Sequence, residues 1–250
     1  MAPVNLTTEA VVISASALGE SDLLITLFTS HTGKLKAVAK GAKRSTKRFM
    51  NALEPFTELT ACLAKSRPSG MWRLDSAVIQ DGHESIRTDF NRFLYASLCL
   101  ELTDLWQKEG IRDPVVLELL KWYLSEVSSS TTPLICSLIF KTRLLKTAGF
   151  MPCLTECKIC GMSPTDNPVF FDRATGEVFC KRCQKGRSGG SLGLGTAMSL
   201  DFMGRAGLDK VGRIRLSKDQ SLEAWQFMKQ LHCRHLHKKP SSYKLISISR

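Results

Sequence analysis

The stretch DLLITLFTSHTGKLKAVAKGAKRSTKRF, residues 22–49, decides how the chain begins to fold. After Asp22, its next seven residues are apolar or β-branched and indicate a strand, which a polar triplet and Gly33 then turn back. In the returning segment, residues 34–40, side chains alternate between the two faces of a strand. One face carries three lysines, Lys34, Lys36 and Lys40. The other face is apolar, so it can join a core while the lysines meet solvent or a ligand.

The same stretch carries an unusual charge. From Lys34 to Arg48 it holds seven Lys or Arg and no Asp or Glu. Gly41 ends the strand, and the other four cations follow in a loop: Lys43, Arg44, Lys47 and Arg48. The whole chain has a net charge of +12, which favours a polyanionic partner, nucleic acid first and an anionic membrane second. The alternative is a solvated basic surface.

Three further segments near the N-terminus read as strands. EAVVISASA precedes the opening stretch, and FTELTACLA and MWRLDSAVIQ follow it as a second hairpin. All are rich in β-branched or apolar residues and are bounded by turn residues. Four or five short strands within residues 1–81 predict a small β-barrel.

The character then changes to helical periodicity. Apolar residues recur at helical spacing in residues 86–110, 113–128 and 132–149, and again in residues 196–208 and 221–238. Asp113 and Pro114 suit the start of the second helix, and Gly149 ends the third. These helices should pack as a bundle. Residues 184–195, QKGRSGGSLGLG, read as a glycine-rich connector.

The cysteines give the sharpest signal. Nine are present, and four form two CxxC pairs separated by nineteen residues: Cys157, Cys160, Cys180 and Cys183. Each pair can form a knuckle, and four thiolates complete the tetrahedron of a structural Zn²⁺. The segment FFDRATGEVFC between them reads as strand, turn, strand, which outlines a zinc ribbon. Free or redox-active thiols are the alternative.

We do not expect the following cysteines and histidines to bind a metal. Cys62, Cys99, Cys136 and Cys153 are expected to be buried thiols. His232 and His235 share one face of a helix, but they lack a second ligand pair with known spacing. We expect them on a solvated helix end.

The fold class is therefore α+β and multidomain. We expect a barrel in residues 1–81, the first part of a helical domain in residues 82–151, a zinc ribbon in residues 152–186, and the second helical part with a basic tail in residues 187–250. No motif for nucleotide binding or hydrolysis is present, so we expect a non-enzymatic protein. The sequence contains no run of eighteen apolar residues, so we expect no transmembrane helix. The N-terminus lacks the basic region of a signal peptide, so we do not expect one there.

Several local motifs carry a family resemblance. They are the hairpin ending in KLKAVAKGAKRS, the strand entry NALEPFTELTACL, the segment FKTRLLKTAGFMPCLTECKICG and the second knuckle GEVFCKRC. In this order and spacing they resemble the RecO family of bacterial DNA-repair and recombination-mediator proteins. The match spans much of the chain between residues 22 and 183.

The resemblance implies an oligonucleotide-binding (OB) fold at the N-terminus and a helical domain that carries the ribbon. It also implies binding to single- and double-stranded DNA and annealing of complementary strands. It implies help in loading the recombinase RecA onto strands covered by single-strand-binding protein (SSB), cooperation with RecR, and a cytoplasmic, nucleoid-associated location. Two alternatives stay open: a zinc-ribbon factor that binds RNA or a polymerase, and an undetected nuclease.

The candidate site residues follow from this frame. An OB-fold binds strands through a cationic groove and stacking aromatics, and the cations expected there are Lys34, Lys36, Lys40, Lys43, Arg44, Lys47 and Arg48. Trp72 is the best stacking candidate, whereas Phe49 and Phe56 are more typical of a core. A rim for the acidic SSB tail is assigned to Lys141, Arg143 and Lys146. A second basic patch lies in residues 205–239, and two patches could hold two strands.

Overall fold

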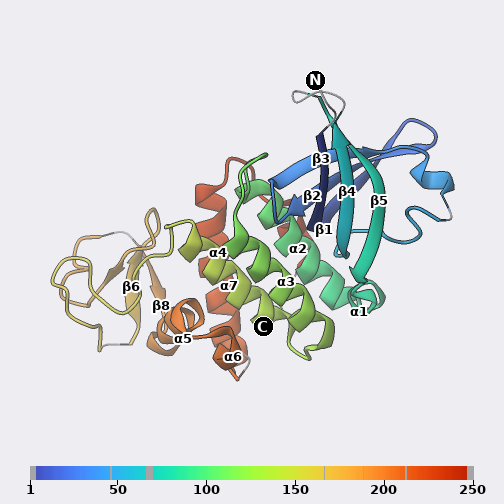
Figure 1. The fold of residues 1–250 in the computed structure, drawn as a ribbon. Helices are drawn as coiled ribbons and strands as arrows, with labels where there is room; N and C mark the ends of the chain where they lie inside the picture. Colours follow the sequence, from blue (N-terminus) through green and yellow to red (C-terminus); the bar gives the residue numbers. More distant parts are fainter. Residues whose placement is uncertain are drawn as a thin grey trace. The chain divides into compact units, whose positions relative to one another are not determined.

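The computed structural model describes residues 4–45, 47–65, 70–165, 167–187, 189–211 and 213–246. The chain forms two compact units, Met1–Ser129 and Ser130–Arg250, whose elements are labelled in Figure 1. The fold is mixed α and β, with a sheet domain at the N-terminus, as predicted. The division falls inside the segment that the sequence assigned to one helical domain, because the first three helices belong with the sheet.

Five strands build the sheet of the first unit. They are β1 (Val4–Leu18), β2 (Asp22–Thr29), β3 (Gly33–Ala39), β4 (Glu58–Lys65) and β5 (Trp72–Asp81). They pair in the order β1-β2-β3-β5-β4, and β4 pairs again with β1, so the sheet closes into a barrel. Every pairing is antiparallel except that of β3 with β5. Each strand lies where the sequence predicted one.

The alternation predicted for β3 is present. Leu35, Ala37 and Ala39 are buried in the barrel core, whereas Lys36 is exposed. Their core neighbours include Ile25 and Leu27 of β2. Because the side-chain period of a strand is two, burial of one face fixes the register and turns the other face outward.

Gly33 holds a position that only glycine can take. Its φ is +67°, and a Cβ built on it would lie 1.8 Å from the carbonyl oxygen of Ile111. The amide of Gly110 donates to the Lys34 carbonyl over 2.8 Å. The start of β3 is therefore pressed against the loop of residues 109–111.

Three helices complete the first unit: α1 (Glu84–Thr88), α2 (Phe90–Trp106) and α3 (Pro114–Ser129). The single helix expected over residues 86–110 is thus two. Asp89 has an extended backbone, and its carboxylate accepts a hydrogen bond from the Arg92 amide at 2.9 Å, which caps the start of α2. Asp113 caps α3 in the same way ahead of Pro114, as predicted.

The second unit contains α4 (Pro133–Thr147), β6 (Val169–Asp172), β7 (Val178–Phe179), β8 (Gly189–Leu192), α5 (Leu194–Arg205), α6 (Leu208–Val211) and α7 (Lys218–His235). Helix α4 packs against α5 and α7. Ser217 and Gln220 form a capping box at the start of α7. The three strands form one sheet in the order β7-β6-β8.

Strand β8 corrects the expected connector. Gly189 and Gly190 pair with Asp172 and Phe171 of β6. A Cβ on Gly190 would lie 2.3 Å from the Phe171 ring, so this glycine lets the strand approach. The composition that resembles a linker is here the composition of a close-packed strand.

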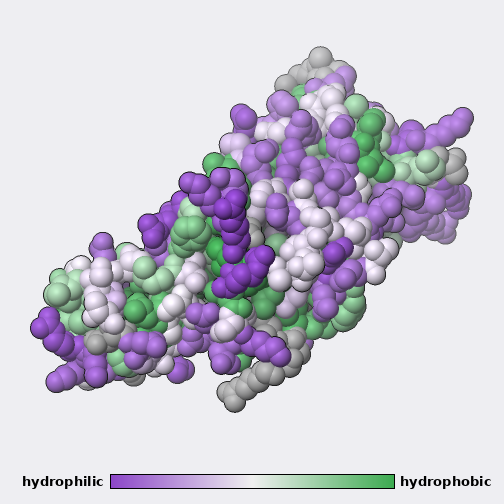
Figure 2. All heavy atoms as spheres, turned by 90° about the horizontal axis from the view of Figure 1, so that it is seen from below, coloured by the Kyte–Doolittle hydropathy of each residue, from purple (hydrophilic) through white to green (hydrophobic). Residues whose placement is uncertain are grey.

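Hydrophilic side chains predominate on the face shown in Figure 2, with hydrophobic groups scattered among them. Within the described ranges, none of the helices combines the length and the hydrophobicity that crossing a bilayer would require.

Candidate nucleic-acid interface and cysteine cluster

The predicted cations at the end of β3 are gathered by backbone contacts. Lys36 is exposed on β3, Lys40 is exposed directly after it, and Lys43, Arg44, Lys47 and Arg48 are exposed further along the chain. The Lys43 ammonium donates to the Gly19 carbonyl over 2.8 Å, and the Arg48 guanidinium donates to the Lys40 carbonyl over 2.9 Å. The basic segment therefore folds back on the β1–β2 turn and on its own strand.

Asp22 anchors this arrangement. Its carboxylate accepts a hydrogen bond of 2.8 Å from the Gly41 amide, where φ of +66° starts the turn into a short 3₁₀ helix, Ala42–Arg44. The Gly41 bond, a bond from Ser21, and the charges of Lys40 and Lys43 lower the pKa of Asp22. A single carboxylate outside the basic run thus organises its turn.

Lys34 differs from the other six cations. Its side chain is 15% exposed, and its ammonium contacts the backbone carbonyl and the carboxylate of Asp104 on α2. The charge of Lys34 is matched inside the first unit. Lys34 also lines a surface hollow beside Trp72, so its role in DNA binding stays a prediction.

Trp72 lies beside two surface hollows of the barrel. The first is lined by Asn5, Val38, Lys40, Ala64, Lys65, Met71, Trp72 and Arg73. The second shares Lys65, Met71 and Trp72 with it and extends past Lys36. The Lys65 ammonium lies 4.4 Å from the centroid of the Trp72 ring, a cation–π contact. An aromatic side chain therefore sits between cations of β3, β4 and β5.

The sequence did not point to Lys65 and Arg73 as part of this groove. Their proximity to Lys40 depends on β3 pairing with β5, in which Val38 lies opposite Arg73. Phe49 and Phe56 are 4% and 2% exposed, so both rings lie in the core and offer no face to a base.

The four cysteines of the two CxxC pairs meet in one cluster. Cys157 is buried, Cys180 and Cys183 are partly exposed, Cys160 is exposed, and all four Sγ atoms lie within 4.8 Å of one another. The Sγ atoms of Cys160 and Cys180 are 3.9 Å apart. Thiolates in a zinc tetrahedron with bonds of about 2.3 Å would be roughly 3.8 Å apart. The cluster could therefore hold a metal ion of this kind.

The thiols of the cluster influence one another. Burial acts to raise the pKa of Cys157, but hydrogen bonds from the amides of Cys160, Cys180 and Ile159 outweigh it and lower that pKa to about 6. The side-chain hydrogen bond with Cys180 raises the pKa of Cys183 to about 12.

Two predictions on nearby residues need correction. Cys153 is exposed rather than buried, whereas Cys99 and Cys136 are buried as expected and Cys62 is half-buried. His232 is fully buried rather than solvated, and its Nε2–H donates to the Lys141 carbonyl over 3.1 Å. Desolvation, together with the charge of Lys141, lowers the pKa of His232 well below its usual value.

The predicted place of Lys141 in a surface rim also needs correction. Its side chain is 0% exposed, and its ammonium lies 3.8 Å from the centroid of the Trp225 ring and 5.0 Å from that of Tyr243. It occupies the buried stripe of α4, three residues after Leu138. Lys141 therefore cannot form a surface rim, unlike the exposed Lys146 and the half-buried Arg143. Arg143 donates to the Ala206 carbonyl.

The second basic patch is exposed in the second unit. Its described cations are Arg205, Lys210, Arg213, Arg215, Lys218, Lys229, Arg234, Lys238 and Lys239. Arg205 pairs with Asp201 over 2.5 Å, and the Lys229 ammonium lies 5.2 Å from the Tyr243 ring centroid.

Comparison with known proteins shows which family the chain belongs to. Residues 1–82 match the family "Recombination protein O N terminal", and residues 87–244 match "Recombination protein O C terminal". A "DNA repair protein RecO" of Myxococcus xanthus is 38% identical over 179 residues, which cover 70% of this chain and 71% of that protein. Its namesake from Syntrophomonas wolfei is 31% identical over 244 residues, 97% and 96% of the two chains. The chain therefore belongs to the RecO family of DNA repair and recombination proteins.

Proposed function

We propose that this chain is a non-enzymatic recombination mediator. It binds single- and double-stranded DNA, anneals complementary strands, and helps load RecA onto SSB-coated DNA together with RecR in the nucleoid. The observation that carries the proposal is the exposed set of six cations on and after β3, of which Lys36 and Lys40 line the hollows beside Trp72. Such a surface suits phosphates and unstacked bases.

The barrel supports this function as an OB-fold. Five strands closed in the order β1-β2-β3-β5-β4 fit the small barrel that binds oligonucleotides across one face. The groove beside Trp72 lies over β3, β4 and β5. A DNA strand that follows this groove would contact the Trp72 indole and the cations Lys36, Lys40 and Lys65.

Zn²⁺ is the cofactor that the cysteine cluster fits best. Four thiolates fill every position of a tetrahedral site, so a bound ion would have no place for a substrate. Its contribution is to hold the two knuckles together. The four cysteines would bind it, and the amide hydrogen bonds to Cys157 orient one of these ligands.

The helical domain is the proposed receptor of the SSB tail. With Lys141 inside the core, the cationic rim consists of Lys146 and Arg143 on α4. A labelled SSB-tail peptide should bind the full chain, and Arg143→Glu combined with Lys146→Glu should weaken binding. Lys218→Glu, an exposed cation of α7, is the control. Equal binding by all three proteins would remove the rim from the proposal.

Binding to a labelled single strand across a salt series tests the central proposal. If five cations engage, the log–log slope should be about −3.5. Changing Lys43, Arg44, Lys47 and Arg48 together to Ala should flatten it by about 2.8. Lys108→Ala with Arg112→Ala, exposed cations of the same unit, should change it less. The absence of DNA binding at low salt would refute the mediator function, and tighter binding to RNA would favour the RNA-binding alternative.

Annealing tests the role of the second basic patch. Two patches can hold two strands and screen their phosphate repulsion. Changing Lys229, Arg234, Lys238 and Lys239 to Ala should slow annealing of complementary strands more than it weakens single-strand binding. Equal losses in the two assays would mean that the patch only adds affinity.

A further inference from the structure

The ribbon sheet of the second unit has one inward and one outward face. Val169 and Phe171 of β6 are buried, and the Phe171 ring lies 4.9 Å from the Phe227 ring of α7. Side chains alternate along a strand, so Phe170 and Asp172 belong to the opposite face. Phe170 is half-buried, and it lines a surface pocket.

Cross-strand partners extend this outward face. Phe170 pairs with Phe179 on β7 and with Ser191 on β8. The Arg187 guanidinium lies 4.8 Å from the centroid of the Phe179 ring, so Phe179 is covered. Phe170 is then the aromatic surface of this face that a ligand can reach.

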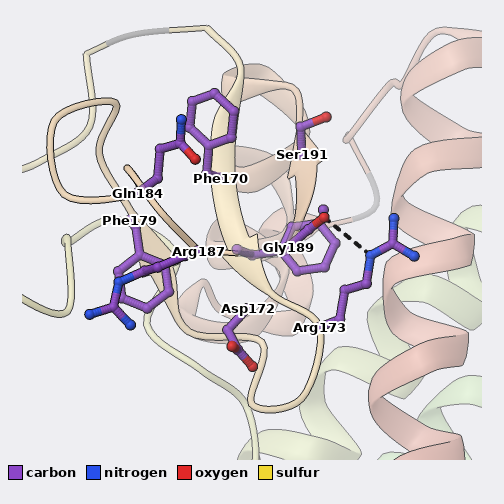
Figure 3. A pocket seen from close by; sticks show the side chains of 10 residues that line it. Phe170, Asp172, Arg173, Phe179, Gln184, Arg187, Gly189 and Ser191 are labelled. Atoms are coloured by element: carbon purple, nitrogen blue, oxygen red, sulfur yellow. Dashed lines mark hydrogen bonds between the residues drawn. The ribbon is translucent and has the colours of Figure 1, made fainter.

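A pocket of about 300 Å³ lies at this sheet, and its lining includes Phe170 together with Phe171 and Gly190 of the other face. Figure 3 shows Phe170 near Gln184 at one end, Phe179 with Arg187 on one side, and Arg173 on the other side. Arg173 Nε donates to the Gly189 carbonyl over 3.2 Å, which orients its guanidinium along the rim.

The charges around the pocket are distributed unevenly. Arg173 and Arg187 are exposed on its rim, and Lys181, Arg182 and Lys185 are exposed on the second knuckle next to it. Asp172 is the anionic member of the lining, and its carboxylate accepts hydrogen bonds from the amides of Ala174 and Thr175 at 2.6 and 2.8 Å. An anion is favoured at the rim rather than at the Asp172 end.

We propose that this face of the ribbon binds single-stranded nucleic acid, with one base stacked on Phe170 and its phosphates on Arg187 and Arg173. The inference rests on the proposed DNA-binding function and adds a contact far along the chain from the barrel. The Gln184 amide and the Ser191 hydroxyl supply donors and acceptors for a base edge. An aromatic face bordered by arginines is the usual platform for an unpaired base.

The full-length protein carries the test. Single-strand affinity should fall by about 5- to 150-fold in Phe170→Ala, the range for losing one stacked base, and Phe170→Tyr should restore it. Arg187→Gln should flatten the salt slope by about 0.7. Phe202→Ala, which removes an exposed ring from α5 of the same unit, should bind like the wild type. Bound zinc and melting temperature verify that each variant is folded.

Crosslinking shows where on the protein the strand binds. An oligonucleotide that carries 5-iodouracil should crosslink to the peptide containing Phe170, and mass spectrometry identifies that peptide. If Phe170→Ala does not fold, Arg187→Gln and the crosslink still decide the question.

The possible failures are distinguishable. If the ribbon variants bind DNA like the wild type and no crosslink forms there, while the barrel-loop variant loses affinity, only this inference is wrong. If the wild type binds no DNA, the proposed function itself is wrong. If the ribbon variants keep DNA binding but lose a labelled Asp-rich peptide, the face is a peptide site and the inference is overturned.

Discussion

The Lys34 ammonium lies 3.1 Å from the Oδ1 atom of Asp104 and also donates to the Asp104 carbonyl. A lysine on the basic face of β3 is thereby attached to α2 of the same unit. Its charge serves the packing of barrel and helix, whereas Lys36 on the same strand and Lys40 directly after it are exposed.

Replacing Lys34 should therefore affect stability more than DNA binding. Lys34→Met should lower the free energy of unfolding by about 1 kcal/mol, because a charged hydrogen bond is lost at a partly exposed site. The DNA salt slope should stay unchanged. Lys40→Met is the matched control and should reduce the slope by about 0.7 with little effect on stability. Denaturant unfolding and anisotropy titrations measure both quantities, and a reversed pattern would place Lys34 in the interface.

A comparison of substitutions at Gly33 and Gly19 separates the cost of backbone strain from the cost of steric overlap. Both have positive φ, but a Cβ at Gly19 meets nothing within 4 Å. Gly19→Ala should cost about 1–2 kcal/mol from the left-handed backbone alone. Gly33→Ala should cost about 1–3 kcal/mol more because it overlaps Ile111. Thermal and chemical unfolding should rank the two variants in this order, and equal losses would mean that the β3 contact relaxes easily.

Trp72 packs against the barrel core, and its effect on DNA binding should come from stacking on a base. Trp72→Ala should weaken single-strand binding by about 1–3 kcal/mol, while Trp72→Phe should retain most of the affinity. The salt slope should change little in either variant, because neither alters a charge. If Trp72→Ala binds single strands as tightly as the wild type, the indole does not stack on a base and has a structural role only.

Metal removal should act through folding. Cys157→Ser should abolish stoichiometric zinc and lower the melting temperature of the second unit, because binding energy in such sites is folding energy. Cys153→Ser is the matched control, since Cys153 is exposed and lies outside the cluster. Zinc content and calorimetry measure the effect. Unchanged zinc in Cys157→Ser would point to a different ligand set.

The buried His232 should make the protein sensitive to acid. Its pKa is lowered in the folded state, so below its ordinary pKa of about 6.5 the unfolded chain binds a proton that the folded chain does not. Stability should fall by about 1.4 kcal/mol per pH unit as the pH drops below that value. His232→Gln should remove this part of the slope. Unfolding measured between pH 7 and 5 should show the difference, and parallel curves would mean that His232 protonates without unfolding.

Local patterns predicted the elements well. β2 begins and ends where its apolar and β-branched composition and the following turn residues placed it, and Asp113 and Pro114 begin α3 as expected. Asp89 could also have been read as a cap, but the apolar periodicity continues across it. The cysteine cluster followed from spacing alone.

Long-range pairing could not be predicted in the same way. Lys34 and Asp104 are 70 residues apart, and the exposed lysine pattern of β3 contains no sign of a partner. The burial of Lys141 depends on Trp225 and Tyr243, which come from elements far along the chain. Its place between Leu138 and Leu145 on the apolar stripe of α4 was the available signal.

The barrel closes through its shortest pairing. β3 and β5 share a register of only two residue pairs, Ala37 with Trp72 and Val38 with Arg73, while the other strand pairs run over seven or more. Opening should cost least at this seam, and the proposed DNA groove crosses it. A bound strand would hold the two sides of this seam together, so the β3 amides that face β5 should exchange hydrogen more slowly when DNA is present.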